Sequence, residues 1–208
     1  MLPMALTMAA ALASLAACAI PEPRARNAAL GFWFEPVSYA SKVLQGPVTP
    51  ADLALIETIA RAEVATAFQG MNITVSDQRD ARYGVQVVQD LLDQRVTTRK
   101  VSIAGESRVV TGFGGRGAVN FTYMASAAVV YAPASASRGE IIEAIGRGIG
   151  RGAVHEFTHQ LLPDTPIDGT QDRLSYEYGA ASRPEQYFGT LHWDLAGPLL
   201  AARFKTSP

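Results

Sequence analysis

The segment from Ser137 to Leu162 constrains the fold of this 208-residue chain more than any other part of the sequence. It opens with Ser137 and, three residues later, Glu140, which is the spacing of a helix capping box, and Pro163 follows its end. Apolar residues recur between these limits at helical intervals, which predicts a long amphipathic helix that buries one face. The residues of that face are Ile141, Ile145, Ile149 and Val154.

Four glycines interrupt the predicted helix at every second position from Gly146 to Gly152. Each interior glycine costs about 1 kcal/mol relative to alanine, so packing must offset a substantial loss of helix stability. Gly146 and Gly150 share one face, and Gly148 and Gly152 share another. We expect smooth surfaces on which another backbone, such as that of a sheet, lies close; a frayed or mobile first half is the alternative that the sequence leaves open.

Helix and strand signals elsewhere predict an α+β domain. A helix should begin at Thr49, a capping residue followed by Pro50, and should end before Gly70. Alternating or β-rich runs then predict strands at 73–75 and 83–88, and the glycine-broken stretch 101–131 predicts a meander or hairpin. We therefore expect a small, mostly antiparallel sheet, with a closing amphipathic helix near 193–204.

The segment Gly112–Gly117 matches the pattern G-x-G-x-x-G of dinucleotide-binding loops. Such a site needs a strand before the loop and a helix after it, whereas a strand-like run, 118–123, follows here. The pattern therefore predicts a glycine-rich hairpin or edge loop instead of a nucleotide site.

Composition excludes several classes of protein. Hydrophobic residues make up 48% and charged residues 18%, which suits one globular domain and not a disordered chain. With 18 Lys and Arg against 19 Asp and Glu, the chain has no basic field to attract nucleic acid. A single Cys forms no internal disulfide or cysteine-based zinc site, so a metal must be bound by carboxylates and the three His.

The chain opens with an uncharged, alanine-rich apolar run that ends in Leu15-Ala16-Ala17-Cys18. This run is too short for a convincing membrane span and has the character of a signal peptide. Its last four residues resemble the lipobox of bacterial lipoproteins, which implies cleavage after residue 17 and an acylated Cys18 that anchors the chain in the membrane. Since Ala19 is not the aspartate used for inner-membrane retention, the resemblance favours the outer membrane, facing the periplasm. An ordinary secretory signal is the alternative.

Residues 18–48 would then form the lipid anchor and a tether, because Pro21 and Pro23 lie in a stretch without periodicity. The aromatic cluster at 31–34 within this stretch either docks on the domain or stays partly exposed for a partner, and docking is favoured because large aromatic residues are usually buried. The folded domain is expected to cover residues 49–208.

The last turns of the long helix carry His155-Glu156-Phe157-Thr158-His159, an H-E-x-x-H motif. Residues four apart on a helix lie one above the other, so both imidazoles can face one metal ion. Glu156 projects about 100° round the helix from His155, where it can reach a metal-bound water without ligating the metal. Two histidines making ordinary structural hydrogen bonds are the alternative reading.

The motif and the order of the predicted elements resemble the zincins, the H-E-x-x-H zinc metallopeptidases. The resemblance implies a zincin-like domain in which a backing helix, a sheet, the motif helix and a C-terminal helical part follow one another. It also implies that His155 and His159 bind Zn²⁺ and that Glu156 is the general base and acid.

The third zinc ligand divides the zincin subfamilies, and the sequence leaves it open. Metzincins place Gly and His or Asp where this chain has Leu162 and Thr165, although Asp164 and Asp168 lie close by. The segment Gly169-Thr170-Gln171-Asp172 is similar to the aspzincin motif with altered spacing, which makes Asp172 a competitor. Gluzincins use a Glu from a following helix, and a helix around 175–181 would supply Glu177, the ligand that we favour; His192 is a further candidate.

The remaining histidine, His192, and Tyr178 are candidates for donating a hydrogen bond to the oxyanion, although a lone histidine is more often structural. The sequence as a whole predicts a monomeric zinc metalloendopeptidase of the bacterial cell envelope that acts on a protein or peptide substrate. A zinc-dependent cell-wall amidase and a non-catalytic envelope lipoprotein with a zincin-like binding module are the alternatives.

Overall fold

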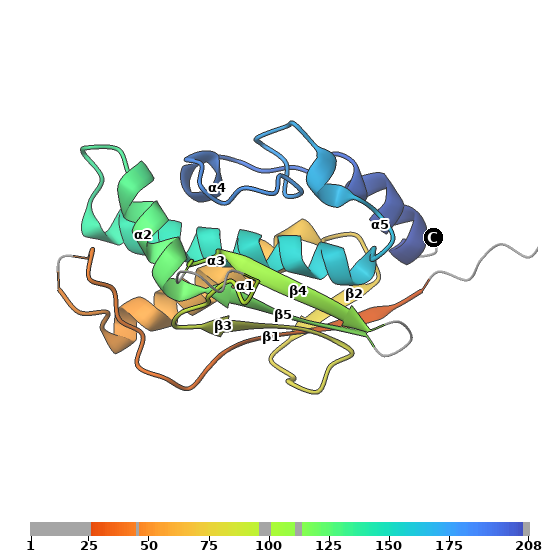
Figure 1. Cartoon of the computed structure of the whole chain (residues 1–208), viewed down its shortest axis with the longest axis horizontal. Helices are drawn as coiled ribbons and strands as arrows, with labels where there is room; N and C mark the ends of the chain where they lie inside the picture. The colour runs from red at the N-terminus through yellow and green to blue at the C-terminus, as the bar shows by residue number, and fades with distance from the viewer. Residues whose placement is uncertain (1–25, 45, 96–100, 111–113, 206–208) are drawn as a thin grey trace, which may run out of the picture.

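The computed structural model describes residues 26–44, 46–95, 101–110 and 114–205. A five-stranded sheet is covered on one face by long helices, and the C-terminal segment lies beyond the helix α3 on the side away from the sheet (Figure 1). The strands are β1 (Ala28–Phe34), β2 (Ile73–Ser76), β3 (Tyr83–Val88), β4 (Gly105–Val110) and β5 (Gly114–Asn120). The helices are α1 (Pro50–Ala67), α2 (Phe121–Tyr131), α3 (Arg138–Leu161), α4 (Glu185–Phe188) and α5 (Ala196–Phe204), with a 3₁₀ turn η1 (Ile167–Gly169). The predicted α+β class is confirmed.

The sheet is mostly parallel, so the expectation of a mostly antiparallel sheet is wrong. Its order is β2-β1-β3-β5-β4, and only β4 runs antiparallel, in its pairing with β5. Alternating hydrophobicity predicts that a segment is a strand, but it holds no information on the direction of the neighbouring strand. The helix α1 lies between β1 and β2 in the chain and provides the long connection that parallel neighbours require.

The folded domain begins earlier than predicted, because the expected tether contains the strand β1. This strand lies inside the sheet between β2 and β3, and its Leu30, Phe32 and Phe34 side chains are buried in the core. The aromatic cluster is therefore docked, as the burial argument favoured, but as part of the sheet and not as an attachment to it. Residues 1–25, including the predicted signal peptide and Cys18, lie outside the described residues.

The meander predicted for 101–131 is only half right. Strands β4 and β5 pair as an antiparallel hairpin, as expected for the glycine-rich loop, of which residues 111–113 lie outside the described part of the chain. After β5, however, Asn120 caps the helix α2 by accepting a hydrogen bond from the backbone N–H of Tyr123 at 3.0 Å. The aromatic and β-branched residues in this stretch suggested a strand, but they pack one face of a helix instead.

The two long helices begin where the sequence predicts. Thr49 and Asp52 form a capping box at the start of α1, and Ser137 and Glu140 form one at the start of α3. Gly70 adopts a positive φ of 79° after α1, a conformation that suits glycine.

The glycines of α3 allow close packing on two faces. A Cβ at Gly146 would lie 2.8 Å from the Cβ of Ile59, and one at Gly150 would lie 2.6 Å from the carbonyl oxygen of Ala60, so α1 lies directly against this face. On the other face, Gly148 contacts the Tyr187 ring and Gly152 contacts Met124. The first half of α3 is thus tightly packed, mainly against another helix and not against the sheet.

The C-terminal part contains less helix than predicted. The expected helix around 175–181 is absent: this segment consists of turns and an isolated bridge between Ser175 and His192, and α4 and α5 are short. The indole N–H of Trp193 donates to the carbonyl oxygen of Ala67 at 2.8 Å, which fixes the segment to the end of α1. Within the described ranges, no helix has the length and apolar character needed to cross a membrane.

Candidate metal centre

The two histidines of the H-E-x-x-H motif face each other on the last turns of α3. Their Nε2 atoms lie 3.2 Å apart, and the imidazole rings are nearly perpendicular, at 84°. This arrangement follows from their four-residue spacing, which places both side chains on one face of the helix. The structure therefore brings His155 and His159 together as the sequence predicts.

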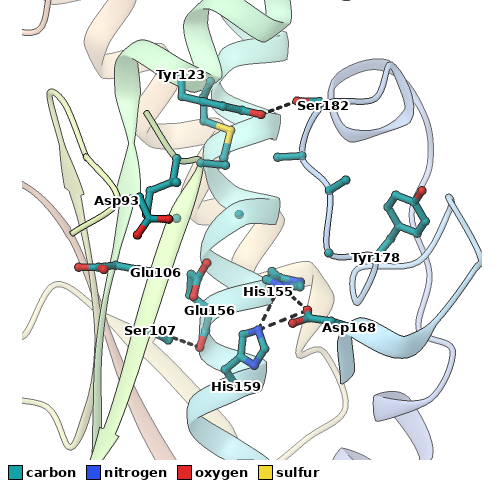
Figure 2. A pocket seen from close by; sticks show the side chains of 18 of the residues that line it. Asp93, Glu106, Ser107, Tyr123, His155, Glu156, His159, Asp168, Tyr178 and Ser182 are labelled. Atoms are coloured by element: carbon teal, nitrogen blue, oxygen red, sulfur yellow. Dashed lines mark hydrogen bonds and ion pairs between the residues drawn. The ribbon is translucent and has the colours of Figure 1, made fainter. Parts of the chain in front are cut away.

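A carboxylate from the loop after α3 completes the cluster. Asp168, in the 3₁₀ turn η1, places its Oδ1 atom 3.1 Å from Nε2 of His155 and 3.5 Å from Nε2 of His159 (Figure 2). Ligand atoms of all three residues lie within 4.8 Å of one another, and the group could hold a metal ion. The sequence shows Asp168 only as a neighbour of the motif, because nothing in it predicts how the loop folds back.

A backbone contact fixes the orientation of His155. Its Nδ1 lies 3.0 Å from the carbonyl oxygen of Tyr176, and a carbonyl is an acceptor, so in the neutral imidazole Nδ1 carries the proton and Nε2 presents a lone pair to the cluster. Burial acts to lower the pKa of His155, but hydrogen bonding to Asp168 and the charge of Glu156 raise it above its ordinary value. The hydrogen bond with His155 holds the pKa of Asp168 below its usual range.

Glu156 lies beside the cluster, in a confined space against the strand β4. Its side chain is buried, and burial raises its pKa to about 7. The Ser107 hydroxyl donates to the backbone carbonyl of Glu156 at 3.0 Å, and a Cβ at Gly105 would lie 2.5 Å from the Glu156 Oε1 atom. The glycine at 105 thus leaves room for the carboxylate between the helix and the strand.

Gln160 fastens the motif helix to the sheet, a role that the sequence analysis missed. Its amide accepts from the N–H of Gly84 and donates to the carbonyl of the same residue, both at 3.1 Å, and it also donates to the Ser107 hydroxyl at 3.1 Å. Gly115 and Gly117 leave space for this side chain on β5. A glutamine on the buried side of a predicted helix, opposite a glycine-rich strand, is the signal that could have revealed it.

The cluster opens into a cavity of about 910 Å³. The strand β4 forms one wall, α3 forms the floor, and the irregular C-terminal segment that contains Asp168 and Tyr178 forms the other wall (Figure 2). We call this cavity the cleft.

The structure does not bring Glu177, the favoured third ligand, to the histidines. Its buried carboxylate accepts hydrogen bonds from the backbone N–H groups of Asp194, at 2.9 Å, and Leu195, at 2.7 Å. The carboxylate is thereby used to tie two parts of the C-terminal segment together. Without the predicted helix around it, the spacing that favoured Glu177 loses its physical basis.

The other candidates also lie outside the cluster. Asp172 pairs with His192 at 2.7 Å, and Asp164 is exposed. His192, a proposed oxyanion donor, is therefore occupied by a carboxylate and does not line the cleft. Tyr178 does line it, but its ring packs against the Arg183 guanidinium, 4.8 Å from the ring centroid, and its hydroxyl points away from His155 (Figure 2).

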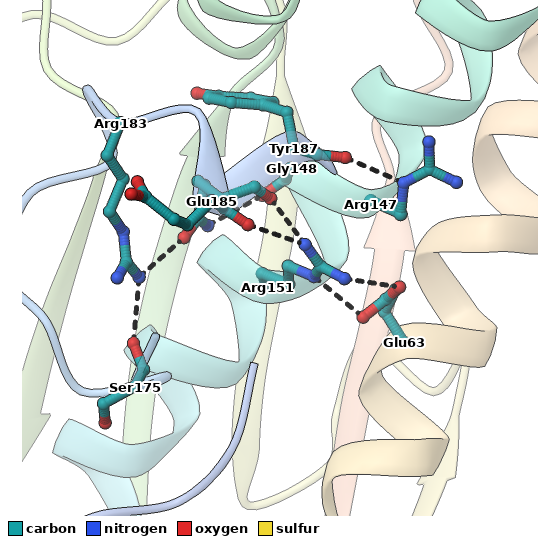
Figure 3. Close-up of polar contacts among 9 residues, drawn as sticks. Glu63, Arg147, Gly148, Arg151, Ser175, Arg183, Glu185 and Tyr187 are labelled. Carbon is teal, nitrogen blue, oxygen red and sulfur yellow. Dashed lines mark hydrogen bonds and ion pairs between the residues drawn. The ribbon is translucent and has the colours of Figure 1, made fainter. Parts of the chain in front are cut away.

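One buried arginine attaches the outer wall of the cleft to the helices, and another links two parts of that wall (Figure 3). Arg151 of α3 pairs with Glu63 of α1 at 3.0 Å and donates to the carbonyl oxygens of Glu185 and Gln186, each at 3.1 Å. Arg183 donates to the carbonyl oxygen of Ser175 at 2.9 Å. These contacts hold the irregular segment in place without regular secondary structure.

Comparisons of the chain with protein-family models, with curated proteins and with solved structures give no match. The geometry of the cleft and the sequence motif therefore carry the functional argument.

Proposed function

We propose that this protein is a zinc-dependent metallopeptidase, in which His155, His159 and Asp168 bind the metal and Glu156 acts as the general base. The observation that carries the proposal is the convergence of two imidazole Nε2 atoms and one carboxylate oxygen beside a buried glutamate, at the floor of an open cleft. Because Asp168 takes the place of Glu177, the proposal departs from the ligand set favoured by the sequence.

The donor set fits a zinc ion. Zinc is commonly bound by imidazole nitrogen and carboxylate oxygen, and catalytic sites use three protein ligands and keep a position open. When Nδ1 of the neutral His155 ring is protonated, its Nε2 lone pair faces the Asp168 Oδ1 atom at 3.1 Å, and a cation between these two acceptors would remove their repulsion. When bound, zinc supplies Lewis-acid chemistry: it polarises a carbonyl and makes water acidic enough to lose a proton near neutral pH.

The residues of the chain would carry the proton transfers. The Glu156 carboxylate accepts a proton from the attacking water and then delivers it to the nitrogen of the leaving amine. Its confinement between α3 and Gly105 keeps it aimed into the cleft.

Among the described residues, the strand β4 pairs with β5 alone, so its other edge is available for binding an extended peptide. It is the last strand in the sheet order and lines the cleft over Gly105–Val109. Strand addition through backbone hydrogen bonds would hold a peptide across the metal centre. The strand-like run 118–123 does not fit this role, because β5 ends at Asn120, is paired on both sides, and is followed by a helix.

The decisive experiment measures zinc content and peptide hydrolysis in the purified chain. We expect about one zinc per chain and an activity that Glu156→Gln lowers by about 100- to 10,000-fold while zinc stays bound. Glu143→Gln, which changes a glutamate at the far end of the same helix, should leave both unchanged. Absence of stoichiometric zinc, or full activity in the Glu156→Gln variant, would overturn the proposal.

The choice of substrates separates the alternatives. Hydrolysis of casein-type peptides supports the peptidase, whereas hydrolysis of cell-wall muropeptides alone would favour the amidase. Bound zinc with no hydrolysis of either would favour a non-catalytic binding module.

The proposal includes a location in the bacterial envelope, facing the periplasm, with Cys18 acylated. It is supported by the lipobox-like sequence that ends at Cys18, the single cysteine of the chain. Expression with Cys18→Ser should move the protein from the membrane fraction to the soluble fraction and remove the mass of the acyl chains. An unchanged distribution and mass would contradict the anchor.

A further inference from the structure

One end of the cleft is closed by a contact between its two sides. The hydroxyl of Tyr123, from α2, is hydrogen-bonded to the hydroxyl of Ser182, from the C-terminal segment (Figure 2). Both residues line the cleft. The contact therefore crosses the space that an extended peptide would otherwise follow.

Further contacts between the same two elements reinforce this closed end. The rings of Tyr131 and Tyr187 stack with their centroids 6.1 Å apart, and the Tyr187 hydroxyl lies 3.4 Å from the sulfur of Met124. Met124, a residue of α2, in turn packs against α3, with its methyl group 2.8 Å from the Cβ position of Gly152. We call Tyr123, Met124 and Ser182 the end wall, because they join α2, the floor of the cleft and the C-terminal segment.

The end wall lies close to the metal centre. Met124 packs over Gly152, which precedes His155 by three residues on the helix. At a rise of about 1.5 Å per residue this separation is about 4.5 Å along the helix axis. An extended peptide advances about 3.3 Å per residue, so about one or two residues fit between the metal centre and the end wall.

The direction of β4 indicates which end of a substrate meets the end wall. Gly105 lies beside the carboxylate of Glu156, and Ser107 bonds to Gln160, so β4 runs away from the end wall. A peptide that pairs antiparallel with β4 runs towards the end wall and points its C-terminus at it. Antiparallel pairing is slightly more stable per residue than parallel pairing, which favours this orientation.

At the opposite end the cleft offers a way out. Among the described residues, no hydrogen bond or ion pair joins β4 to the loop 163–168. A substrate can therefore continue in its N-terminal direction past His159.

We propose that the end wall makes this protein a carboxypeptidase that removes about one or two residues from the free C-terminus of a peptide. Water adds across the peptide bond, its hydroxyl going to the new C-terminal carboxylate and its proton to the amine of the released amino acid or dipeptide. This inference rests on the proposed peptidase function and narrows the endopeptidase expected from the sequence. Tyr123 and Ser182 act as specificity-determining residues, because they limit how far the substrate extends beyond the cut.

The test maps cut positions in a mixture of random ten-residue peptides with acetylated N-termini, incubated with the full chain and analysed by mass spectrometry. For the wild type we expect at least tenfold more cuts at the last two peptide bonds than at all internal bonds. Tyr123→Ala should remove this preference, because it deletes the ring that crosses the cleft. Tyr123→Phe keeps the ring and should retain most of the preference, and Tyr83→Ala, a tyrosine outside the cleft, is the matched control.

The outcomes separate the two proposals. Zinc-dependent cleavage that is spread over internal bonds, or confined to the N-terminal end of unblocked peptides, overturns the carboxypeptidase proposal. It does not contradict the proposal that the protein is a metallopeptidase. The same cut distribution in Tyr123→Ala as in the wild type also overturns the carboxypeptidase proposal. No cleavage of any peptide by the zinc-loaded chain overturns both proposals.

Discussion

The three proposed metal ligands come from two regions of opposite character. His155 and His159 lie on α3, a regular helix whose glycine faces are packed against α1 and the C-terminal segment. Asp168 lies in a single 3₁₀ turn within an irregular loop, and its side chain is 58% exposed. The helix fixes its two ligands through backbone geometry, whereas the loop depends on tertiary contacts to place the third.

This difference bears on how the centre forms. The histidine pair is set as soon as α3 forms, but Asp168 reaches it only after the chain has turned back from Pro163. The turn that carries Asp168 is held by tertiary packing, because the neighbouring Ile167 is fully buried in the core. We therefore expect loss of the Asp168 carboxylate to change metal binding, and substitutions at packed or internally hydrogen-bonded positions to change stability.

The largest expected effect is that of Asp168→Ala on metal affinity. Removal of one of three ligands should raise the zinc dissociation constant at least about 100-fold, or about 2.7 kcal/mol, with little change in circular dichroism. Asp164→Ala, an exposed aspartate in the same loop, is the matched control and should bind zinc as the wild type does. Calorimetric titration with zinc measures both variants. Equal affinities would show that the loop contributes no ligand through Asp168.

Glu177→Gln should have the reverse effect of Asp168→Ala, because it should lower stability and leave zinc binding unchanged. The buried carboxylate accepts from two backbone N–H groups, and an amide would turn one donor towards another. We expect the free energy of unfolding to fall by about 2 kcal/mol, while zinc stoichiometry stays at one per chain. Loss of zinc without loss of stability would restore Glu177 as the ligand that the sequence favoured.

Sequence patterns predicted the helical region well and the loop region poorly. The caps at Thr49 and Ser137, the strands of 73–75 and 83–88, and the facing of His155 and His159 follow from short-range rules of capping and periodicity. Asp168 was seen only as a neighbour of the motif, because its position depends on how the loop folds back onto α3. The parallel sheet was missed for a related reason, since strand direction depends on which distant segment becomes the neighbour.

The helical region is tested by Gly150→Ala. A Cβ there would lie 2.6 Å from the Ala60 carbonyl oxygen and 2.7 Å from the Glu63 Cβ, so α1 and α3 would have to separate. Although alanine favours helix, we expect a net loss of about 1 to 2 kcal/mol in the free energy of unfolding, measured by urea denaturation. Gly139→Ala, in the first turn of the same helix, has no atom closer than 3.8 Å and should be neutral or stabilising. Similar effects in the two variants would contradict close packing as the reason for the glycine.

The smallest effect is expected at the start of α3, far along the helix from the metal centre. Asp52 bonds to Arg138 at 2.8 Å and accepts from the Thr49 N–H at 2.9 Å. The hydrogen bond with Arg138 is the main cause that holds the pKa of Asp52 well below its usual range. A carboxyl whose pKa is lowered by folding stabilises the protein above its unfolded pKa, about 3.9, and loses that contribution as the pH falls through the folded value.

We therefore expect Asp52→Ala to lower the free energy of unfolding by roughly 1 kcal/mol at pH 7 and by progressively less below about pH 4. Asp52→Asn retains a capping acceptor without the charge and should lose only part of this stability. Zinc affinity at pH 7 should be unchanged in both variants, because the contact between α1 and α3 near Arg138 adds stability without positioning a ligand. A loss of unfolding free energy in Asp52→Ala that does not depend on pH would contradict the role of the Asp52 charge. Weaker zinc binding in either variant would show that the contact between α1 and α3 also helps to position the metal ligands.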